Sequence, residues 1–330
     1  MTAKSAIRAL RPTHLVALRA FDSRATVAEL TAPAWPRVAD GDGSLPLWSL
    51  LSHSMVHSTG LRRAWVHVAS DGLDGLVIAR VRCGGLVWDV RHLWVDGAHD
   101  GVAQELLVRV CEEATARGAR RVFLETGLET EERAIAARAG FEQYTEATLH
   151  VLPAGRRPSG PAWPGARPRR RRDEFRLFQL YTVAVPAPVR AAEALTLAEW
   201  VALHKGAKRW APGLLTNRQQ QVWEHEDALV AWLEIAYGAK SQHAEWLVHP
   251  AHEAACDGLV AHAAQLVSPK QPLYATTRIY QQPLASALDR AGFEVVARRA
   301  VFVRQLAVRV PERAPERGLV AVRARPTLGG

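Results

Sequence analysis

The sequence predicts an α/β (α+β) protein of two tandem copies of one unit, each a mixed, mostly antiparallel sheet with helices on both faces. Three observations lead to this prediction. An apolar helical stripe occurs twice with the same spacing, a strand–helix–strand pattern follows it both times, and a segment dense in Pro, Gly and Arg separates the two copies. With 330 residues, of which 48% are hydrophobic, the chain can bury a core in each copy.

The repeated stripe predicts one long helix in each copy. Its apolar residues stand at i, i+4, i+5, i+8, i+9 and i+12, which places them on one helix face. We therefore expect helices across residues 102–114 and 255–267. The stripe residues are Val102, Leu106, Leu107, Val110, Cys111 and Ala114 in the first copy, and Ala255, Leu259, Val260, Ala263, Ala264 and Val267 in the second.

A short strand, a short helix and a final strand follow each stripe. Both short helices end in the letters Arg-Ala-Gly-Phe, with the glycines at Gly140 and Gly292. Glycine suits the position after a helix end because it adopts a left-handed conformation without strain. The pattern predicts short strands at residues 121–124 and 272–275, and final strands at 141–151 and 293–308.

Upstream of each stripe, short apolar runs with tight turns between them predict an antiparallel meander. In the first copy, Asp71-Gly72 and Gly84-Gly85 suit hairpin connections because these residues tolerate positive φ. The predicted strands cover residues 64–69, 75–82 and 85–95 in the first copy, and 221–224, 228–237 and 243–248 in the second.

Composition marks the boundaries between the parts of the chain. Residues 153–174, PAGRRPSGPAWPGARPRRRRDE, are dense in Pro, Gly and Arg, which favours an exposed linker. This linker separates a first unit at 1–152 from a second unit at 175–309. Residues 310–330 form a tail rich in Pro, Arg and Gly.

The charge balance indicates which ligands the chain favours. The formal net charge is +9, and a basic protein favours acidic ligands such as phosphates. Part of this charge lies in the linker run Arg169–Arg172, which we expect to be solvated rather than bound to nucleic acid or membrane. We therefore do not expect a nucleic-acid partner.

The cysteines and the apolar runs bear on the cellular compartment. Cys83, Cys111 and Cys256 are scattered and odd in number, which argues against a disulfide framework or a cysteine zinc site. No apolar run approaches the roughly 18 residues of a membrane span, and the N-terminus lacks the apolar core of a signal peptide. We expect a cytoplasmic protein.

One histidine pair has a spacing that can bind zinc. His53 and His57 stand four residues apart in a predicted helix. No third ligand accompanies them, so we expect a pair on a helix face and no metal site.

The order of helices and strands in both copies resembles the GCN5-related N-acetyltransferase (GNAT) family, and the likeness covers most of both copies. The repeated helix–strand–helix–Gly-Phe–strand layout carries it more specifically than any short motif. The resemblance implies that acyl-CoA binds as a cosubstrate where two central strands splay apart. It also implies that the pyrophosphate lies at the N-terminus of the long helix, where free N–H groups and the helix dipole favour an anion.

The loop before the long helix of the first copy keeps part of the family pattern, Arg/Gln-x-x-Gly-x-Gly/Ala. The matching letters are Ala98-His99-Asp100-Gly101-Val102-Ala103, so the Gly-x-Ala end is kept and Ala98 replaces the leading Arg or Gln. Asp96 and Asp100 add negative charge, which opposes pyrophosphate binding. By the resemblance, acetyl-CoA or another acyl-CoA would contact Trp94, Val95, His99, Asp100, Gly101, Val102 and Ala103.

The corresponding loop of the second copy departs further from the pattern. Residues 249–255 contain no glycine, and Glu253 stands where phosphate would lie. We therefore expect the coenzyme in the first copy and not in the second.

Acyl transfer to an amine needs a base, because the amine must be neutral to attack the thioester. The candidates are Asp89 and His92 on the strand before the loop and Glu125 at the end of the next strand. The alternative is that Asp89 and Glu125 are solvated carboxylates, and that His92 is a half-buried histidine with satisfied hydrogen bonds.

In this family, the tyrosine that protonates the leaving thiol usually lies four residues before the glycine of the Gly-Phe pair. Here Ala136 and Leu288 occupy those positions, which departs from the pattern in both copies. Tyr144 or Tyr280 could substitute, and the alternative for both is amphipathic packing.

These features predict an enzyme, an N-acyltransferase that moves an acyl group from acyl-CoA to a primary amine of a small-molecule or peptide acceptor. One alternative is a non-catalytic GNAT-like binding or scaffold protein, because the usual tyrosine and the leading Arg or Gln are missing. The other is an aminoacyl-tRNA-dependent transferase, a class that also uses paired GNAT-like units. The sequence leaves the acceptor and the oligomeric state open.

Overall fold

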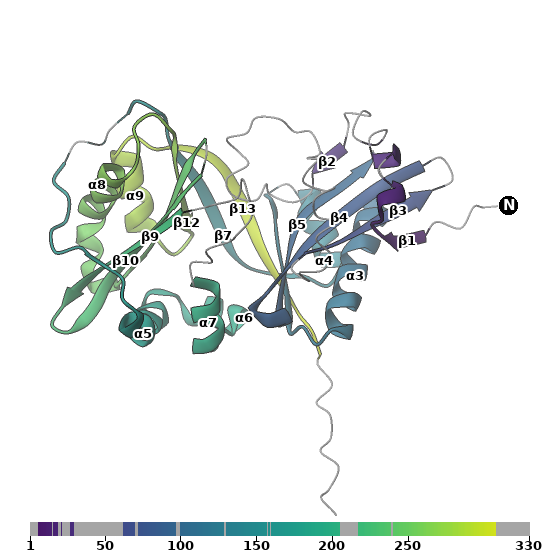
Figure 1. Ribbon diagram of the computed structural model, residues 1–330, viewed down its shortest axis with the longest axis horizontal. Helices are drawn as coiled ribbons and strands as arrows, with labels where there is room; N and C mark the ends of the chain where they lie inside the picture. Colours follow the sequence, from purple (N-terminus) through teal and green to yellow (C-terminus); the bar gives the residue numbers. More distant parts are fainter. Residues whose placement is uncertain are drawn as a thin grey trace, which may run out of the picture.

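The computed structural model has one continuous sheet running through both copies, with helices against its two faces (Figure 1). It describes residues 6–14, 16–18, 21, 27–29, 62–69, 72–96, 100–128, 130–156, 158, 160–204, 217–238 and 240–307. His53, His57 and the tail at 310–330 lie outside these residues. Within them, no helix combines the length and the apolar character that a membrane crossing requires.

In the described residues, thirteen strands form this sheet. Two neighbouring pairs, β5 with β6 and β11 with β12, are parallel, and the others are antiparallel. The mixed, mostly antiparallel arrangement that the sequence predicts is confirmed. In sheet order the strands are β1 (Ala6–Ala9), β3 (Arg62–Ala69), β4 (Gly72–Arg82), β5 (Val87–Asp96), β6 (Arg121–Gly127), β13 (Glu294–Gln305), β7 (Glu142–Leu152), β12 (Leu273–Arg278), β11 (Gln242–Val248), β10 (Ala228–Tyr237), β9 (Asn217–His225) and β8 (Arg167–Pro168), with β2 (Val27–Glu29) beside β5.

Helices pack on both faces of the sheet and define its main cores. On one face, α3 and α4 bury the core of the first copy, and α8 and α9 bury that of the second. On the other face, α5, α6 and α7 form a further core with β9 and β10 of the second copy. The helices are α3 (Asp100–Ala116), α4 (Thr130–Arg138), α5 (Glu174–Ala184), α6 (Ala187–Glu193), α7 (Leu197–His204), α8 (Cys256–Leu266) and α9 (Gln282–Arg290), with short 3-10 turns η1 (Pro12–His14), η4 (Cys83–Gly85), η5 (Arg171–Asp173) and η6 (Pro250–Ala255).

The two short helices α4 and α9 end in the same way, as the repeated Gly-Phe pair predicts. Gly140 has φ 78° and Gly292 has φ 84°, both in the left-handed region. The next residue then turns its N–H back onto the helix: Phe141 donates to the Ala136 carbonyl and Phe293 to the Leu288 carbonyl, each at 3.0 Å. This shared helix end directs the chain into the final strand of each copy.

The two copies exchange these final strands. β7, from the first copy, lies between β13 and β12, which both belong to the second copy. β13, from the second copy, lies between β6 and β7, which both belong to the first. Figure 1 shows the two long strands at the middle of the molecule, where they join the halves of the sheet. The sequence pattern predicted one sheet in each copy, and the exchange fuses them.

The exchange satisfies backbone groups that would otherwise lie at open sheet edges. β13 pairs with β6 over seven residue pairs, from Arg121 opposite Gln305 to Gly127 opposite Arg299. β7 pairs with β12 over six residue pairs. An open edge of this length presents unpaired N–H and C=O groups and invites pairing with another chain. The edge strands β6 and β12 are therefore each completed by a strand of the other copy.

The segment at 153–174, predicted as an exposed linker, docks in part on the second copy. The Trp163 N–H donates to the Gly258 carbonyl at 3.1 Å, and its indole stacks on Trp223 with ring centroids 5.8 Å apart. A Cβ at Gly258 would lie 2.9 Å from the Trp163 nitrogen, so α8 approaches this segment closely because that position is glycine. The packing of Trp163 thus holds part of this segment against the second copy, although the composition of the segment predicts an exposed linker.

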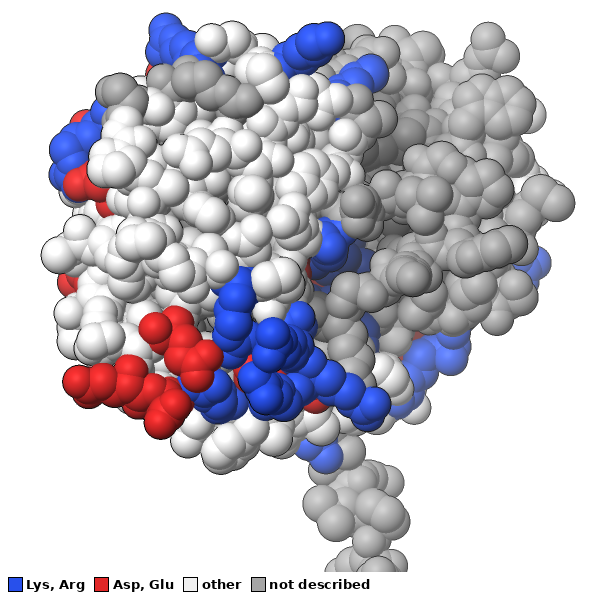
Figure 2. Space-filling view, turned by 60° about the vertical axis from the view of Figure 1, so that its left-hand side comes forward, with Lys and Arg blue, Asp and Glu red and all other residues white. Residues whose placement is uncertain are grey.

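The arginines of the same segment divide into paired and solvated ones. Arg167 makes a two-pronged ion pair with the buried carboxylate of Asp173, at 2.8 and 2.9 Å. Arg170, Arg171 and Arg172 are exposed, as expected for a solvated run. Figure 2 shows basic side chains gathered next to acidic ones on this side of the molecule, so the charges partly compensate one another.

Helix α3 lies close to the sheet because Gly75 on β4 has no side chain. A Cβ at Gly75 would lie 2.7 Å from Val102 Cγ1 and 2.8 Å from Leu106 Cδ1. Both of these side chains come from the first two turns of α3. Gly75 therefore sets the position of the helix N-terminus beside the end of β5.

We expect Gly75→Ala to destabilise the protein by about 1–3 kcal/mol, because the added methyl group overpacks the contact with α3. Urea denaturation would measure the loss. Gly101→Ala is the matched control, because a Cβ at Gly101 meets no atom within 4 Å and alanine favours a helix. Equal denaturation midpoints for the two variants would contradict this account.

The strand exchange predicts the behaviour of a nicked chain. A protease site inserted after Arg156, followed by cleavage, leaves two fragments whose strands remain in one another's sheet. We expect the fragments to co-elute in size-exclusion chromatography under native conditions and to separate only in denaturant, because the ladders of β7 and β13 hold them together. Separate elution under native conditions would show that the copies do not share these strands.

Candidate active site

The parallel strands β5 and β6 pair only at their beginning and then diverge. Their ladder consists of three pairs and ends at Asp89 opposite Phe123. Beyond it, β5 continues to Asp96 and β6 to Gly127. The second copy repeats this geometry, because β11 and β12 pair over three residues and their ladder ends at Ala244 opposite Ala275. Each copy therefore contains the splayed strand pair that the resemblance implies.

A β-bulge lies on β5 at the point where the strands diverge. Ile78 on β4 faces His92 and the next residue, Ala79, faces Val90, so Arg91 is the extra residue of the bulge. The side chains of β5 change face there: Val90 and Leu93 both pack into the core under α3, although they are three positions apart and would point to opposite faces of a regular strand. A bulge re-aims side chains and bends its strand, which opens the gap further.

The N-terminus of α3 follows β5 and points into this region. The helix begins at Asp100, and a Cβ added at Gly101 would meet no described atom within 4 Å. Val102 and Ala103 are buried in the core, so they can offer a ligand only their backbone. His99 and the side chain of Asp100 lie outside the described residues. An open backbone at a helix N-terminus fits a phosphate group.

The far end of β5 already has a strand partner on the side of the gap. β2 pairs antiparallel with β5 through Val27 opposite Asp96, Ala28 opposite Val95 and Glu29 opposite Trp94. β4 occupies the opposite edge of the same residues of β5, with Leu76 facing Trp94 and Gly75 facing Val95. A ligand cannot use this backbone edge while β2 is in place. The predicted contacts at Trp94 and Val95 therefore require β2 to move.

In the second copy, the backbone N–H groups before α8 are used internally. The Ala251 N–H donates to the His249 imidazole at 3.1 Å, and the His252 N–H donates to the His249 carbonyl at 2.8 Å. The Cys256 N–H, at the start of α8, donates to the Glu253 carbonyl. The backbone N–H groups that a phosphate would need are therefore already hydrogen-bonded within η6.

The first candidate base, Asp89, forms a buried ion-pair cluster. Its carboxylate accepts hydrogen bonds from Arg80 Nη2 at 2.8 Å and Arg82 Nη2 at 2.5 Å. Burial opposes ionisation, but Arg82 and Arg80 outweigh it and lower the pKa of Asp89. A carboxylate with a lowered pKa and two arginine partners is a poor proton acceptor, so this environment is that of a structural ion pair.

The second candidate, His92, lies beside an aromatic ring. Its imidazole stacks on Trp94, with ring centroids 4.7 Å apart and an angle of 7° between the planes. Trp94 is buried in a small core with Leu10 and Phe21. Stacking on a buried ring fixes the orientation of the His92 imidazole.

Glu125 and Tyr144 meet on the face of the sheet opposite α3. Glu125 pairs with Arg299 at 3.5 Å and keeps 39% of its side-chain surface exposed. Tyr144 is the extra residue of a bulge on β7, because Thr145 faces Val301 and Gln143 faces Phe302. Its ring makes an edge contact with Phe123, which is two residues before Glu125 on β6. Burial raises the pKa of Tyr144, so its phenol stays protonated.

Arg278 joins this cluster from the second copy. Its Nη1 is shielded from solvent and has no hydrogen-bond partner among the described residues. Burial lowers the pKa of the guanidinium, but four neighbouring groups act more strongly and raise it. These neighbours are Tyr144, Glu125, Tyr280 and Glu193.

A second carboxylate, Glu245 on β11, belongs to the same region. Burial, with a contribution from Glu125, raises the pKa of Glu245 even though 48% of its side-chain surface is exposed. The two carboxylates therefore interact across the strands that lie between β6 and β11.

Sequence reasoning named Glu125, Asp89, His92 and Tyr144, and the structure brings only Glu125 and Tyr144 together. It missed Arg278, Arg299 and Glu245. These three come from the second copy, and the exchanged strands join their part of the sheet to that of the first copy. No local sequence signal marks such a placement.

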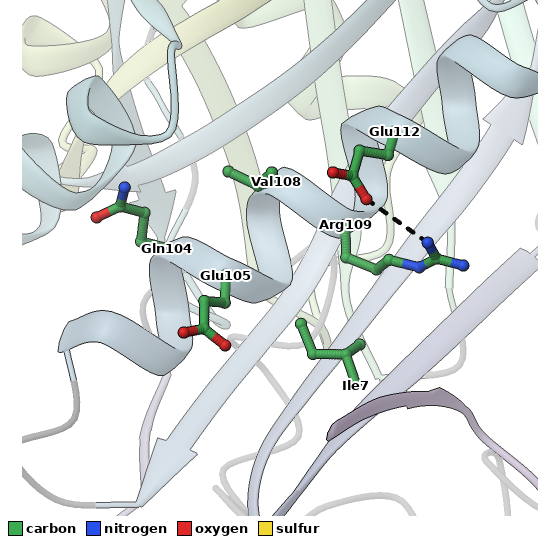
Figure 3. A pocket seen from close by; sticks show the side chains of 6 residues that line it. All are labelled: Ile7, Gln104, Glu105, Val108, Arg109 and Glu112. Atoms are coloured by element: carbon green, nitrogen blue, oxygen red, sulfur yellow. Dashed lines mark ion pairs between the residues drawn. The ribbon is translucent and has the colours of Figure 1, made fainter. Parts of the chain in front are cut away.

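A surface pocket lies away from this cluster, between β1 and the outer side of α3 (Figure 3). Its charged lining is partly paired, with Arg109 3.5 Å from Glu112. It contains none of the predicted site residues, and we assign it no function. In the described part of the chain, no group of three or more His, Cys, Asp and Glu residues could hold a metal ion.

Comparison with known proteins identifies the fold. No protein-family model and no curated protein matches the chain. A GCN5-related N-acetyltransferase from Sphaerobacter thermophilus is 16% identical, with a TM-score of 0.57, over 91% of this chain and 95% of that one. A tandem GNAT protein from the clavulanic acid biosynthesis pathway, solved without AcCoA, is 14% identical, with a TM-score of 0.52, over 92% and 98%. A putative acetyltransferase from Pyrococcus horikoshii is 11% identical, with a TM-score of 0.51, over 93% and 92%.

These likenesses extend over nearly the whole of each chain. The protein therefore has the tandem GNAT acetyltransferase fold, as the order of its predicted elements implied.

The ion pairs of Asp89 predict a pH-dependent stability. We expect Asp89→Asn to destabilise the protein by about 2–4 kcal/mol at pH 7, because Arg80 and Arg82 lose their buried partner. The lowered pKa means that Asp89 stabilises the fold fully above its unfolded pKa of about 3.9 and loses this contribution as the pH falls through the folded value. Urea denaturation at pH 7 and at decreasing pH would show the difference from wild type shrinking. A constant difference at all pH values would contradict the ion-pair account.

Proposed function

We propose that the chain is an N-acyltransferase that moves an acetyl or other acyl group from acyl-CoA to a primary amine of a small-molecule or peptide acceptor. The observation that carries the proposal is the splay of β5 from β6 after three parallel pairs, next to the N-terminus of α3. A gap between diverging strands can admit the extended arm of a coenzyme. The adjacent helix N-terminus offers N–H donors to its pyrophosphate. The GNAT fold supports the same reaction class.

The reaction requires the acceptor nitrogen to lose a proton and the coenzyme sulfur to gain one. The neutral nitrogen attacks the thioester carbonyl carbon, the C–S bond breaks, and the thiolate leaves. Glu125 suits the role of proton acceptor because its carboxylate is partly exposed beside the gap. Glu245 is a further candidate, because a raised pKa brings a carboxylate closer to the pH at which a base works well.

Tyr144 suits the role of hydrogen-bond donor to the leaving sulfur. Its phenol stays protonated, since burial raises its pKa, and it lies on the same face as Glu125. A protonated phenol can stabilise the departing thiolate by a hydrogen bond, and the thiolate then takes its proton from solvent. Tyr144 would thus substitute for the tyrosine that the family usually has at the position of Ala136.

The coenzyme site that we propose is in the first copy. The backbone at Gly101, Val102 and Ala103 would bind the pyrophosphate, with His99 and Asp100 before it. Trp94 and Val95 would offer their backbone to the coenzyme arm only after β2 leaves the edge of β5. Binding of the coenzyme and displacement of β2 would then be coupled.

The pairing of β2 with β5 also favours a second candidate, a non-catalytic GNAT-like binding protein. In such a protein β2 would remain on β5 and the gap would stay occupied by the chain itself. Acetyl-CoA would then fail to bind. Binding therefore separates the two candidates.

Gly101→Glu tests the coenzyme site. We expect wild-type protein to bind acetyl-CoA in isothermal titration calorimetry, and Gly101→Glu to weaken binding roughly tenfold or more, because a carboxylate would face the pyrophosphate. The side chain has room, since a Cβ at Gly101 meets no atom within 4 Å. Gly101→Gln, which is nearly isosteric and neutral, is the matched control and should bind nearly as wild type does.

Two results would count against the proposal. The absence of binding heat with wild-type protein at about 1 mM acetyl-CoA, the upper end of common KM values, would remove the acyltransferase function. Equal affinities of the Glu and Gln variants for acetyl-CoA would show that the pyrophosphate does not bind at the α3 N-terminus.

We further propose that the protein works in the cytoplasm. Its three cysteines, Cys83, Cys111 and Cys256, are free thiols. Free, unpaired cysteines are typical of proteins in a reducing compartment.

A further inference from the structure

Four residues form one row across the four central strands. Gly127 on β6 faces Arg299 on β13, Arg299 also faces Ala147 on β7, and Ala147 also faces Arg278 on β12. Residues directly opposite one another in antiparallel strands point to the same face. The row therefore places two arginines on one face, with Ala147 between them and Gly127 beside them. A Cβ at Gly127 would lie 2.7 Å from Glu132 Oε2, so a carboxylate of α4 lies against that end of the row.

Hydrogen-bond donors near Arg278 lack acceptors. Nη1 of Arg278 is shielded from solvent and unpaired among the described residues. The phenols of Tyr144 and Tyr280 both interact electrostatically with this guanidinium, and neither hydrogen-bonds to another described residue. Burial raises the pKa of Tyr280 to about 12 and that of Tyr144 further, so both remain donors at neutral pH. Of these donors, Nη1 of Arg278 is the one that is shielded from solvent without a described acceptor, which is costly and favours a ligand that supplies one.

Carboxylates lie beside these donors. Glu125 is 3.5 Å from Arg299 and partly exposed. Glu193 is near Arg278, and its carboxylate accepts a hydrogen bond from the Tyr181 phenol at 2.5 Å. The region therefore offers partners to an anionic group and to a cationic group at once.

We propose that the acceptor is a small zwitterion of the α-amino acid type, held at the seam between the copies. Its carboxylate binds Arg278 and the phenol of Tyr280, and its amine lies at Glu125. The proposal rests on the proposed function for the fate of the amine, and it adds the class of acceptor. The binding groups come from both copies, because Glu125 belongs to the first and Arg278 and Tyr280 to the second.

The charges of the site favour a zwitterion over other ligands. A ligand with only anionic groups would bring unneutralised charge next to Glu125 and Glu193. An amine without an anionic group would leave the Arg278 donors without an acceptor. A zwitterion satisfies both sets of groups, and a carboxylate matches the planar fork of a guanidinium.

The test is ligand-observed NMR on the full chain with the standard α-amino acids. Each amino acid is compared with its carboxamide and with the carboxylic acid that lacks the amine. The concentration is about 10 mM, above common KM values. We expect at least one amino acid to bind and both of its analogues to bind roughly tenfold more weakly. If no amino acid binds, or if the carboxamide binds as tightly, the proposal is overturned.

Arg278→Gln tests the residue that carries the proposal. We expect it to reduce the affinity for the bound amino acid by roughly tenfold or more, since it removes a charge-assisted hydrogen bond, and to leave the weak binding of the carboxamide unchanged. Arg278→Lys keeps the charge and should lose less. Arg298→Gln, at an exposed position of β13 next to Arg299, is the matched control. Equal affinities for the Arg278→Gln and Arg298→Gln variants would overturn the proposal, and circular dichroism would confirm that each variant is folded.

The same samples separate this proposal from the proposed function. Titration with acetyl-CoA reports on the α3 site independently of the amino acid. Coenzyme binding without amino acid binding overturns the acceptor proposal and leaves the acyltransferase function. Arg278-dependent amino acid binding without coenzyme binding supports the zwitterion site and removes the acyltransferase function.

Discussion

The ladder between β7 and β13 is the interaction on which the rest of the structure depends. Its nine residue pairs join the last strand of one copy to the last strand of the other. The ladder completes β6 and β12, and it fixes the distance between the two splayed strand pairs. It also brings Glu125, from the first copy, and Arg278, from the second, to one face of the sheet. The candidate acceptor site exists only because backbone hydrogen bonds hold the copies in this register.

Irregularities in the ladders orient the groups that line the site. The bulge at Arg91 turns β5 where it leaves β6, and the bulge at Tyr144 turns a phenol toward the face that carries Glu125. A bulge disrupts the hydrogen-bond ladder locally, and bulges are common where a side chain must point in another direction. Both bulges lie at the centre of the sheet, near the point where the strands diverge. Their position links the shape of the sheet to the chemistry proposed for it.

The fold could be predicted from the sequence as far as local periodicity reaches. The apolar stripe of α3 and the glycines Gly140 and Gly292 specify helices and helix ends through contacts within a few residues. The exchange could not be predicted, because β7 has the same alternating pattern whichever strand lies beside it. Arg278 could not be assigned to the site, because only this exchange brings its strand, β12, next to β7. Glu125 was predicted from its place at a strand end and Tyr144 from its place just after the Gly-Phe pair, and both stay predictions. The pairing of Asp89 with Arg80 and Arg82 depends on three-dimensional contacts that the sequence does not show.

The row of Gly127, Arg299, Ala147 and Arg278 shows what joining the copies in one polypeptide makes available. In a homodimer with two-fold symmetry, any side chain placed at one of these positions would appear again at its symmetry mate. Here Gly127 corresponds to Arg278 and Ala147 to Arg299, so the first copy contributes small residues to the row and the second copy contributes arginines. Covalent linkage lets the two copies change independently, so each position of the row can hold a side chain that its counterpart in the other copy lacks.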